Sequence, residues 1–168
     1  MGGTMQAMLP LADTARAAPC PPRIVIDTNV LLDLWVFDDV RVRPLRAALA
    51  AGRLQPMRSA DTDAELIDVL GRPQFALAAD RQCAVLQDWQ ALAHAMPRVF
   101  AAPWHCTDRR DQKFLDLAHT AGAAVLLTKD KAVLKVNRRA QRDGVLIQTP
   151  EAWVAALQVG GMAAMGHQ

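Results

Sequence analysis

Short apolar runs that alternate with helix-like segments constrain this fold most strongly. Residues 24–26, 123–127 and 145–147 are continuous runs of aliphatic or small side chains, and each is followed by polar residues. The segments between them carry apolar residues at helical spacing, for example over 80–95 and 111–121. Such strands, apolar on both faces and joined by helices, are typical of a parallel sheet covered on both sides. We therefore predict an α/β fold, with a further strand within residues 54–58.

Length and composition predict one globular domain. The chain has 168 residues, 52% hydrophobic and 21% charged, which is ordinary usage for a folded protein. No uncharged apolar run approaches the roughly 18 residues of a membrane span, so no membrane partner is expected. The three cysteines are widely spaced and form no CxxC pair, so they predict neither disulfides nor a zinc site. A cytoplasmic location is expected.

Both ends of the chain lack the patterns that predict packed elements. Residues 1–22 carry few charges and end in several prolines, which predicts a flexible leader rather than a secretory signal. Residues 159–168 are rich in glycine and small side chains, which predicts a loose tail. The predicted working domain therefore covers residues 23–158.

Two aspartates follow predicted strands at matched positions. Asp27 comes directly after residues 24–26, and Asp130 follows residues 123–127 after two intervening residues. Ligands of open parallel sheets bind beyond the carboxyl ends of the strands, so neighbouring strands would bring both carboxylates to one crevice. The alternative is that each aspartate caps the next helix, which by itself would explain either one.

Two further acids are candidates for the same site. Glu65 lies in the first turns of a predicted helix, and Asp111 begins the helix before residues 123–127. Favourable interaction with the helix dipole is the alternative for both. Carboxylates 4 Å apart repel by about 4 kcal/mol per pair at an effective dielectric constant near 20, so a shared pocket needs a cation. All-oxygen ligands suit one or two Mg²⁺ or Mn²⁺ ions, which can promote phosphodiester hydrolysis.

Four segments, in order, resemble the motifs of PIN-domain ribonucleases. They are residues 24–31 (IVIDTNVL), 65–75 (ELIDVLGRPQF), 111–123 (DQKFLDLAHTAGA) and 125–131 (VLLTKDK). The order and approximate spacing agree over roughly residues 23–155. The branch that the chain most resembles is the VapC-like toxins of toxin–antitoxin pairs.

This resemblance implies a three-layer α/β/α sandwich around a short parallel sheet, and metal-dependent cleavage of RNA. It implies that the catalytic and metal-binding residues are Asp27, Glu65, Asp111 and Asp130. Asn29 and Thr128 match small polar positions that support the acids without binding the metal. Asp108 lies close to Asp111 and is the alternative ligand.

A basic cluster follows the last acidic motif. Lys129 departs from the family pattern, which often has glycine there, and would either contact phosphate or weaken metal binding. The predicted RNA contacts are Lys129, Lys131, Arg138 and Arg139. A solvated charged face is the alternative, and the net charge of +2 does not decide between them. Trp104 is open to two interpretations, a stacking platform for a base or a packing residue.

Three functional hypotheses follow. The leading one is a metal-dependent endoribonuclease that acts as the toxin of a toxin–antitoxin pair, with a small antitoxin protein as partner. The second is a phosphatase-like hydrolase with Asp27 as nucleophile, although such enzymes usually carry a second aspartate where this chain has Asn29. The third is a PIN module that binds RNA or a partner without cleavage. The apolar segment 30–36 adds the expectation of a homodimer.

Overall fold

The structure is a computed structural model that describes residues 20–165, with side chains described as far as residue 159. Within these residues, five short strands form one sheet in the order β3-β2-β1-β4-β5, and all neighbouring strands are parallel. The strands are β1 (Arg23–Ile26), β2 (Gln55–Arg58), β3 (His94–Ala95), β4 (Val125–Leu127) and β5 (Leu146–Gln148). The predicted α/β fold with a parallel sheet is confirmed.

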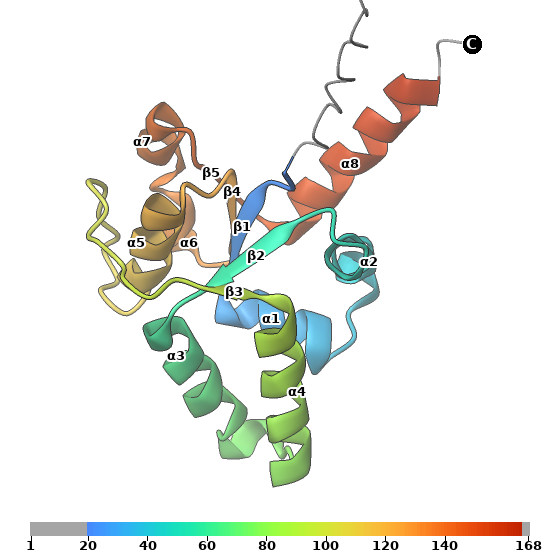
Figure 1. Cartoon of the computed structure of the whole chain (residues 1–168), viewed down its shortest axis with the longest axis vertical. Coiled ribbons are helices and arrows are strands. Elements are labelled where there is room, and N and C mark those ends of the chain that lie inside the picture. The colour runs from blue at the N-terminus through green and yellow to red at the C-terminus, as the bar shows by residue number, and fades with distance from the viewer. Residues whose placement is uncertain (1–19, 166–168) are drawn as a thin grey trace, which may run out of the picture.

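Helices connect the strands and cover the sheet (Figure 1). The α-helices are α1 (Thr28–Trp35), α2 (Arg43–Ala50), α3 (Ala60–Leu70), α4 (Ala79–Leu92), α5 (Gln112–Ala121), α6 (Lys131–Leu134), α7 (Asn137–Ala140) and α8 (Pro150–Met165). Short 3-10 helices lie at Val40–Val42, Pro73–Phe75 and Gln141–Asp143.

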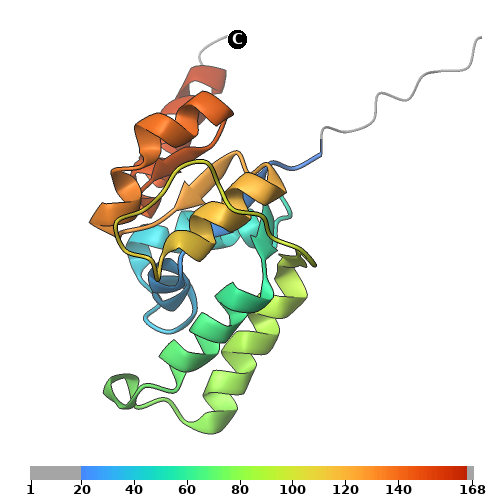
Figure 2. The ribbon, with the colours of Figure 1, turned by 90° about the vertical axis from the view of Figure 1, so that its left-hand side faces the viewer.

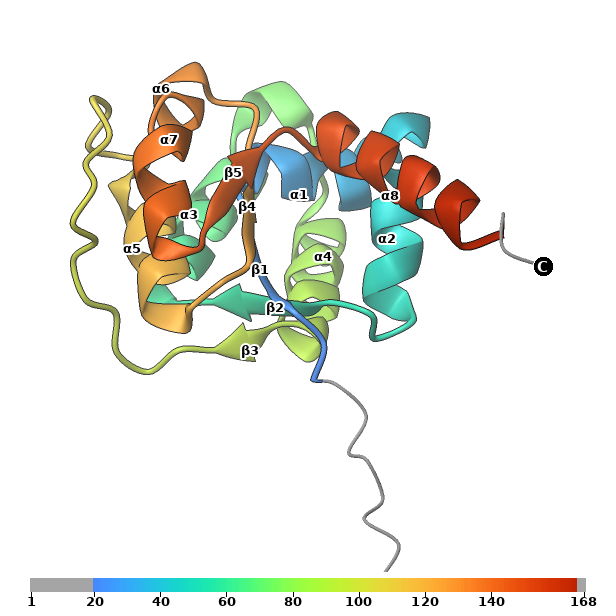
Figure 3. The same ribbon diagram turned by 90° about the horizontal axis from the view of Figure 1, so that it is seen from above.

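The two faces of the sheet carry separate hydrophobic cores. In β1, Ile24 and Ile26 point into a core shared with α1–α4 and α8, whereas Val25 points into a core shared with α5–α7. This alternation follows from the two-residue period of a strand. Figure 3 shows α5, α6 and α7 on one side of the strands and α1, α2 and α8 on the other. The arrangement is the predicted three-layer sandwich.

Helices α3 and α4 extend as a pair beyond the sheet (Figure 2). Ser59 begins α3 in a capping box, in which its hydroxyl accepts from the Thr62 amide and the Thr62 hydroxyl accepts from the Ser59 amide. Helix α4 ends at Leu92 rather than at residue 95, because His94 and Ala95 pair with β2 as β3. An exposed strand of two residues has no hydrophobic pattern that could have predicted it.

The segment 30–36 is part of the chain's own core. Its apolar residues through Trp35 are buried in the core beneath the sheet. The apolarity that suggested a homodimer is therefore explained within one chain, and the homodimer itself stays a prediction. Helix α8 keeps the backbone helical as far as Met165, and most of the predicted leader lies outside the described residues. None of the helices from residue 20 to 165 combines the length and apolarity needed to cross a membrane.

Candidate active site

The site lies where the connections of the sheet change direction. Strand β1 pairs with β2 on one side and with β4 on the other. Ile26 is in register with Leu127, and the Asp27 amide donates to the Leu127 carbonyl at 2.9 Å. Asp27 and Thr128 therefore leave the sheet side by side at its carboxyl edge. This is the position at which open α/β sheets bind ligands.

Asp27 is a buried carboxylate held by a hydroxyl. Its side chain is 3% exposed, and its Oδ2 accepts from the Thr128 hydroxyl at 2.6 Å. Its Oδ1 accepts from the Asn29 backbone amide at 3.4 Å, so Asp27 caps the beginning of α1. Burial, and to a lesser degree the charges of Glu65 and Asp130, raises the pKa of Asp27 above its usual value. Thr128 thus makes the supporting contact that the resemblance implied, whereas Asn29 contacts Asp27 through its backbone and exposes its side chain.

Asp130 lies three residues after Leu127, the last residue of β4. Its Oδ1 accepts from the amides of Ala132 at 2.7 Å and Val133 at 3.1 Å, so it caps α6. Its own amide donates to the Thr128 hydroxyl oxygen at 3.0 Å. The Thr128 side chain therefore joins Asp27 to the backbone of Asp130. Asp27 and Asp130 are both helix caps and neighbours at one edge of the sheet, so the two interpretations of these residues are compatible.

Asp111 is half-buried beside the other acids. Its pKa is raised to about 6, first by burial and then by the charges of Asp27, Asp130, Asp108 and Glu65. It directly precedes α5, but its side chain makes no capping hydrogen bond to that helix. Asp108 is exposed, and its Oδ1 accepts from the Arg110 amide at 2.9 Å. The structure thus brings the four predicted acids together, and it places Asp111 deeper than Asp108.

A cavity of about 570 Å³, the acidic cavity, opens beside three of the four predicted acids, and Asp27 does not belong to its lining. Glu65, Asp111 and Asp130 line it, together with Thr28 and Asn29. The Thr28 Oγ1 is buried and lacks a hydrogen-bond partner within residues 20–165. A buried, unsatisfied hydroxyl among carboxylates is consistent with a polar ligand such as a hydrated ion.

The acids fit a hard divalent cation by donor type, but one of them is engaged elsewhere. Glu65 forms an ion pair with the Lys113 ammonium of α5. As the side chains stand, no group of three acidic, histidine or cysteine side chains in the described part of the chain encloses a metal position. Carboxylate oxygens are nevertheless the ligands that Mg²⁺ and Mn²⁺ prefer. The mutual charge effects on the pKa of Asp111 show that the carboxylates are close enough to interact. Their roles as ligands stay predictions.

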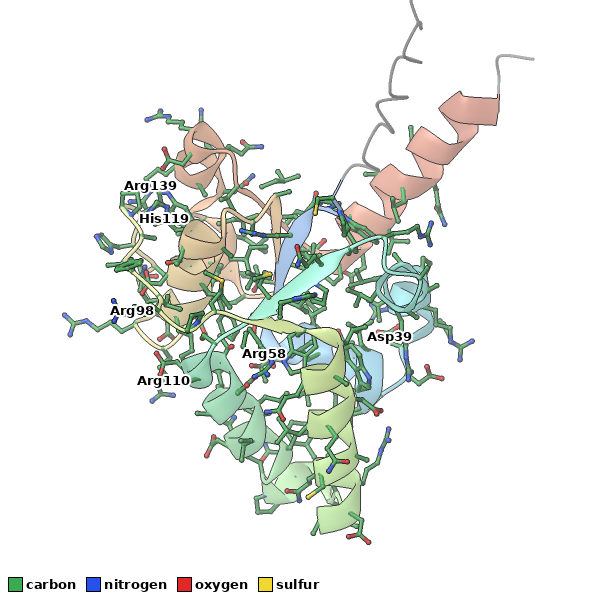
Figure 4. The ribbon with its side chains drawn as sticks, viewed as in Figure 1. Asp39, Arg58, Arg98, Arg110, His119 and Arg139 are labelled. Atoms are coloured by element: carbon green, nitrogen blue, oxygen red, sulfur yellow. The ribbon has the colours of Figure 1, made fainter. Side chains whose placement is uncertain are left out.

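The four predicted RNA contacts do not line this cavity. Lys129 pairs with the buried Asp33 of α1, and Arg139 donates to the His105 carbonyl at 3.0 Å. Lys131 and Arg138 are exposed on α6 and α7. None of these four residues is among the described residues that line the cavity. Figure 4 shows Arg139 on the side of α7 and Arg110 on the side of α3.

The basic residues that do line the cavity differ from the four predicted RNA contacts, although the sequence already places Arg110 and Lys113 close to Asp111. The basic residues of the cavity are Arg72, Arg110 and Lys113. Arg110 and Lys113 lie within two residues of Asp111 in sequence, and Arg72 lies two residues after the end of the helix that carries Glu65. These spacings were the available signal, although the charge cluster after Asp130 was denser.

Trp104 is a packing residue. Its side chain is 2% exposed, and its indole Nε1 donates to the Asp143 carboxylate at 2.7 Å. The interpretation as a base-stacking platform is wrong, because the ring faces are covered within the core that includes α5.

Comparison with known protein families gave one match. The family model for the PIN domain matches residues 23–132 of the 168. The matched segment contains all four acids discussed above. Proteins with curated descriptions gave no match to the chain.

Proposed function

The chain belongs to the PIN-domain family, and on this premise we propose that it is a metal-dependent endoribonuclease. PIN domains are in general nucleases, which use divalent metals in most cases. The observation that carries the proposal is that Glu65, Asp111 and Asp130 line one cavity at the carboxyl edge of β1 and β4, with the buried Asp27 carboxylate close enough to raise the pKa of Asp111. Their repulsion is costly without a cation, and such clusters are a mark of functional sites.

The residues that would hold the ion are Asp27, Asp111 and Asp130, with Glu65 once it leaves Lys113. One or two Mg²⁺ or Mn²⁺ ions would supply an activated water and neutralise the charge of the phosphodiester. The Thr128 hydroxyl fixes the Asp27 carboxylate in one orientation and joins it to the turn of Asp130. That preorganisation avoids rearranging the acids when the substrate binds.

The basic side chains of the cavity would position the substrate beside the acids. Arg72, Arg110 and Lys113 provide positive charge for the phosphates of RNA. The pKa of Asp111, raised to about 6 by burial and by the other carboxylates, reflects the crowding of negative charge that a bound cation would relieve.

A second candidate function is an RNA-binding PIN module without cleavage. The observation that favours it is the ion pair between Glu65 and Lys113, which occupies one of the four acids. In this case the basic side chains of the cavity would bind RNA, and no metal-dependent turnover would follow.

We also propose that the protein acts in the cytoplasm as the toxin of a toxin–antitoxin pair. Support comes from the four ordered motifs that resemble VapC-like toxins. Induced expression of the wild type in a bacterial host should arrest growth, and expression of Asp27→Asn should not. Equal growth of both strains, at equal protein levels, would contradict the toxin role.

The experiment that tests the nuclease is cleavage of single-stranded RNA with Mn²⁺, with Mg²⁺ and with a chelator. Wild-type protein should cleave only with metal. Asp27→Asn should lower the cleavage rate by more than about 100-fold. Substitution of residues that only support metal ligands already costs about 10–100-fold in activity, and loss of a ligand should cost more. Asp80→Asn, an exposed acid at the start of α4, is the matched control and should cleave normally.

Two results would overturn the nuclease. RNA binding with no cleavage in any metal would support the second candidate. Equal cleavage by wild type and Asp27→Asn would remove the acidic site from the reaction, and covalent labelling of Asp27 by a phosphate mimic would instead indicate the phosphatase chemistry considered from the sequence.

A further inference from the structure

A second cavity adjoins the acidic one. It has a volume of about 660 Å³, and Lys113 lines both cavities. Asp61 at the beginning of α3 forms part of its lining, and Arg109, His105 and Gln112 line it as well. Both cavities therefore lie between α3 and the chain segment that leads into α5.

One face of α3 runs along both cavities. Asp61, Glu65 and Asp68 are spaced by four and three residues, so they form one stripe on the helix, and Arg72 follows two residues after its last residue, Leu70. Asp61 lines the second cavity, whereas the other three line the acidic cavity. At 1.5 Å per residue the stripe from Asp61 to Asp68 is about 10 Å long. Since phosphates of a stacked strand follow at roughly 3.4 Å, this length accommodates more than one nucleotide.

The two cavities together form a trough, and its two walls differ in charge. The α3 wall presents the carboxylates of Asp61, Glu65 and Asp68. The opposite wall presents Arg109 in the second cavity and Arg110 in the acidic one. The ion pair of Lys113 with Glu65 joins the walls where the cavities meet.

We propose that the second cavity binds the nucleotide of single-stranded RNA next to the one in the acidic cavity, with its phosphate on Arg109 and Lys113. This inference rests on the proposed function and names a further part of its substrate site. The phosphate lies on the basic wall, and the ribose lies towards α3, where the Asp61 carboxylate accepts from its 2′-hydroxyl. Hydroxyl groups of this kind distinguish RNA from DNA.

The mixed lining argues for a polynucleotide rather than a free anion. A small anion in the second cavity would meet Arg109 and Lys113, but also the carboxylates of Asp61 and Asp116. A nucleotide presents a negative phosphate on one side and hydrogen-bond donors on the other, so it matches both walls. Gln112 donates to the Asp116 Oδ1 at 2.9 Å and accepts from the Cys106 amide at 2.9 Å, which holds this side of the cavity in place.

The test measures how salt affects binding of a fluorescein-labelled single-stranded oligoribonucleotide to protein that carries Asp27→Asn. Each phosphate contact contributes about 0.7 to the slope of log K against log salt for single strands. Arg109→Ala should lower the magnitude of that slope by about 0.7 and weaken binding of all sequences alike. Arg109 is exposed, so we expect the variant to fold, and its melting temperature checks this.

The matched control is Arg98→Ala. Arg98 belongs to the same connecting segment, is exposed, and points away from the body of the molecule in Figure 4. The slope of log K against log salt for the Arg98→Ala variant should equal that of the protein that carries Asp27→Asn alone. Equal slope changes in Arg98→Ala and Arg109→Ala would overturn the inference. Asp61→Asn should reduce the preference for RNA over DNA of the same sequence, and an unchanged preference would overturn the ribose assignment.

Failure of this inference is distinguishable from failure of the nuclease. With otherwise wild-type protein, Arg109→Ala should raise KM for an oligoribonucleotide and leave kcat unchanged. If the wild type cleaves RNA and Arg109→Ala has the same KM, the second cavity is not a substrate site although the nuclease stands. If the wild type does not cleave but Arg109→Ala still lowers the salt slope, the nuclease fails and the RNA site remains.

Discussion

Three aspartates are buried to a similar degree, but their surroundings differ. Asp63 is 7% exposed and pairs with Arg58, and Asp33 is 6% exposed and pairs with Lys129. Asp27 is 3% exposed, yet it is held by the Thr128 hydroxyl and has the carboxylates of Glu65 and Asp130 nearby. Burying a charge is costly unless a partner compensates. The ion-paired acids therefore connect parts of the fold, whereas Asp27 is left with a charge that a ligand can neutralise.

The Arg58–Asp63 pair shows what a structural acid does. Arg58 lies at the end of β2, and its Nε also donates to the Ala93 carbonyl at 3.2 Å before β3. Gln90 of α4 donates to the same Asp63 carboxylate at 3.4 Å. These contacts fasten α3 and α4 to the edge of the sheet. Among the described residues no cation pairs with Asp27, which accepts from the neutral Thr128 hydroxyl instead, and this is consistent with a different role.

The largest expected effect on stability is that of Arg58→Met. Removing the cation leaves the Asp63 carboxylate buried without a charge partner, which should lower the free energy of unfolding by about 3 kcal/mol. Urea denaturation measures the loss. The double variant Arg58→Met with Asp63→Leu should recover most of it, because no unpaired charge remains. A single variant as stable as the wild type would mean that the pair does not hold the fold.

A similar but ligand-dependent effect is expected at Asp27. Asp27→Asn should leave the metal-free protein at least as stable as the wild type, because it removes repulsion and retains a side chain suited to capping α1. Mn²⁺ at about 100 times its Kd should stabilise the wild type by about 2.7 kcal/mol, and the variant much less. Thermal unfolding with and without Mn²⁺ measures both. An equal shift in both proteins would place the ion away from Asp27.

The smallest effect is a pH dependence that comes from Asp111. Its pKa is about 6 in the folded protein, against 3.8 for the ordinary group, so the folded state binds the proton more tightly. Stability of the metal-free protein should therefore fall as the pH rises from about 4 to about 6, and this contribution should be absent in Asp111→Asn. Denaturation of both proteins across this range provides the comparison. Parallel pH profiles would contradict the shift.

The sequence by itself determined the layers and the edge at which the site lies. Buried strands appear as continuous apolar runs, and an aspartate directly after such a run must lie at the carboxyl end of its strand. Local sequence alone therefore assigns Asp27 to the carboxyl edge of the sheet, and it places Asp130 close to the same edge, two residues further from its strand. Strand β3 escaped prediction because its two residues are exposed and owe their conformation to pairing with β2.

Only the tertiary structure decided which charges meet. Lys113 reaches Glu65 across 48 positions of the chain, and Lys129 reaches Asp33 across 96. No local pattern encodes such pairs, because they depend on how helices pack over the sheet. The same holds for Trp104, whose irregular local sequence gives no sign that its ring is buried against α5. Local sequence specifies hydrophobic periodicity and strand ends, but the electrostatic partner of a side chain is set by the packing of segments that are distant in sequence.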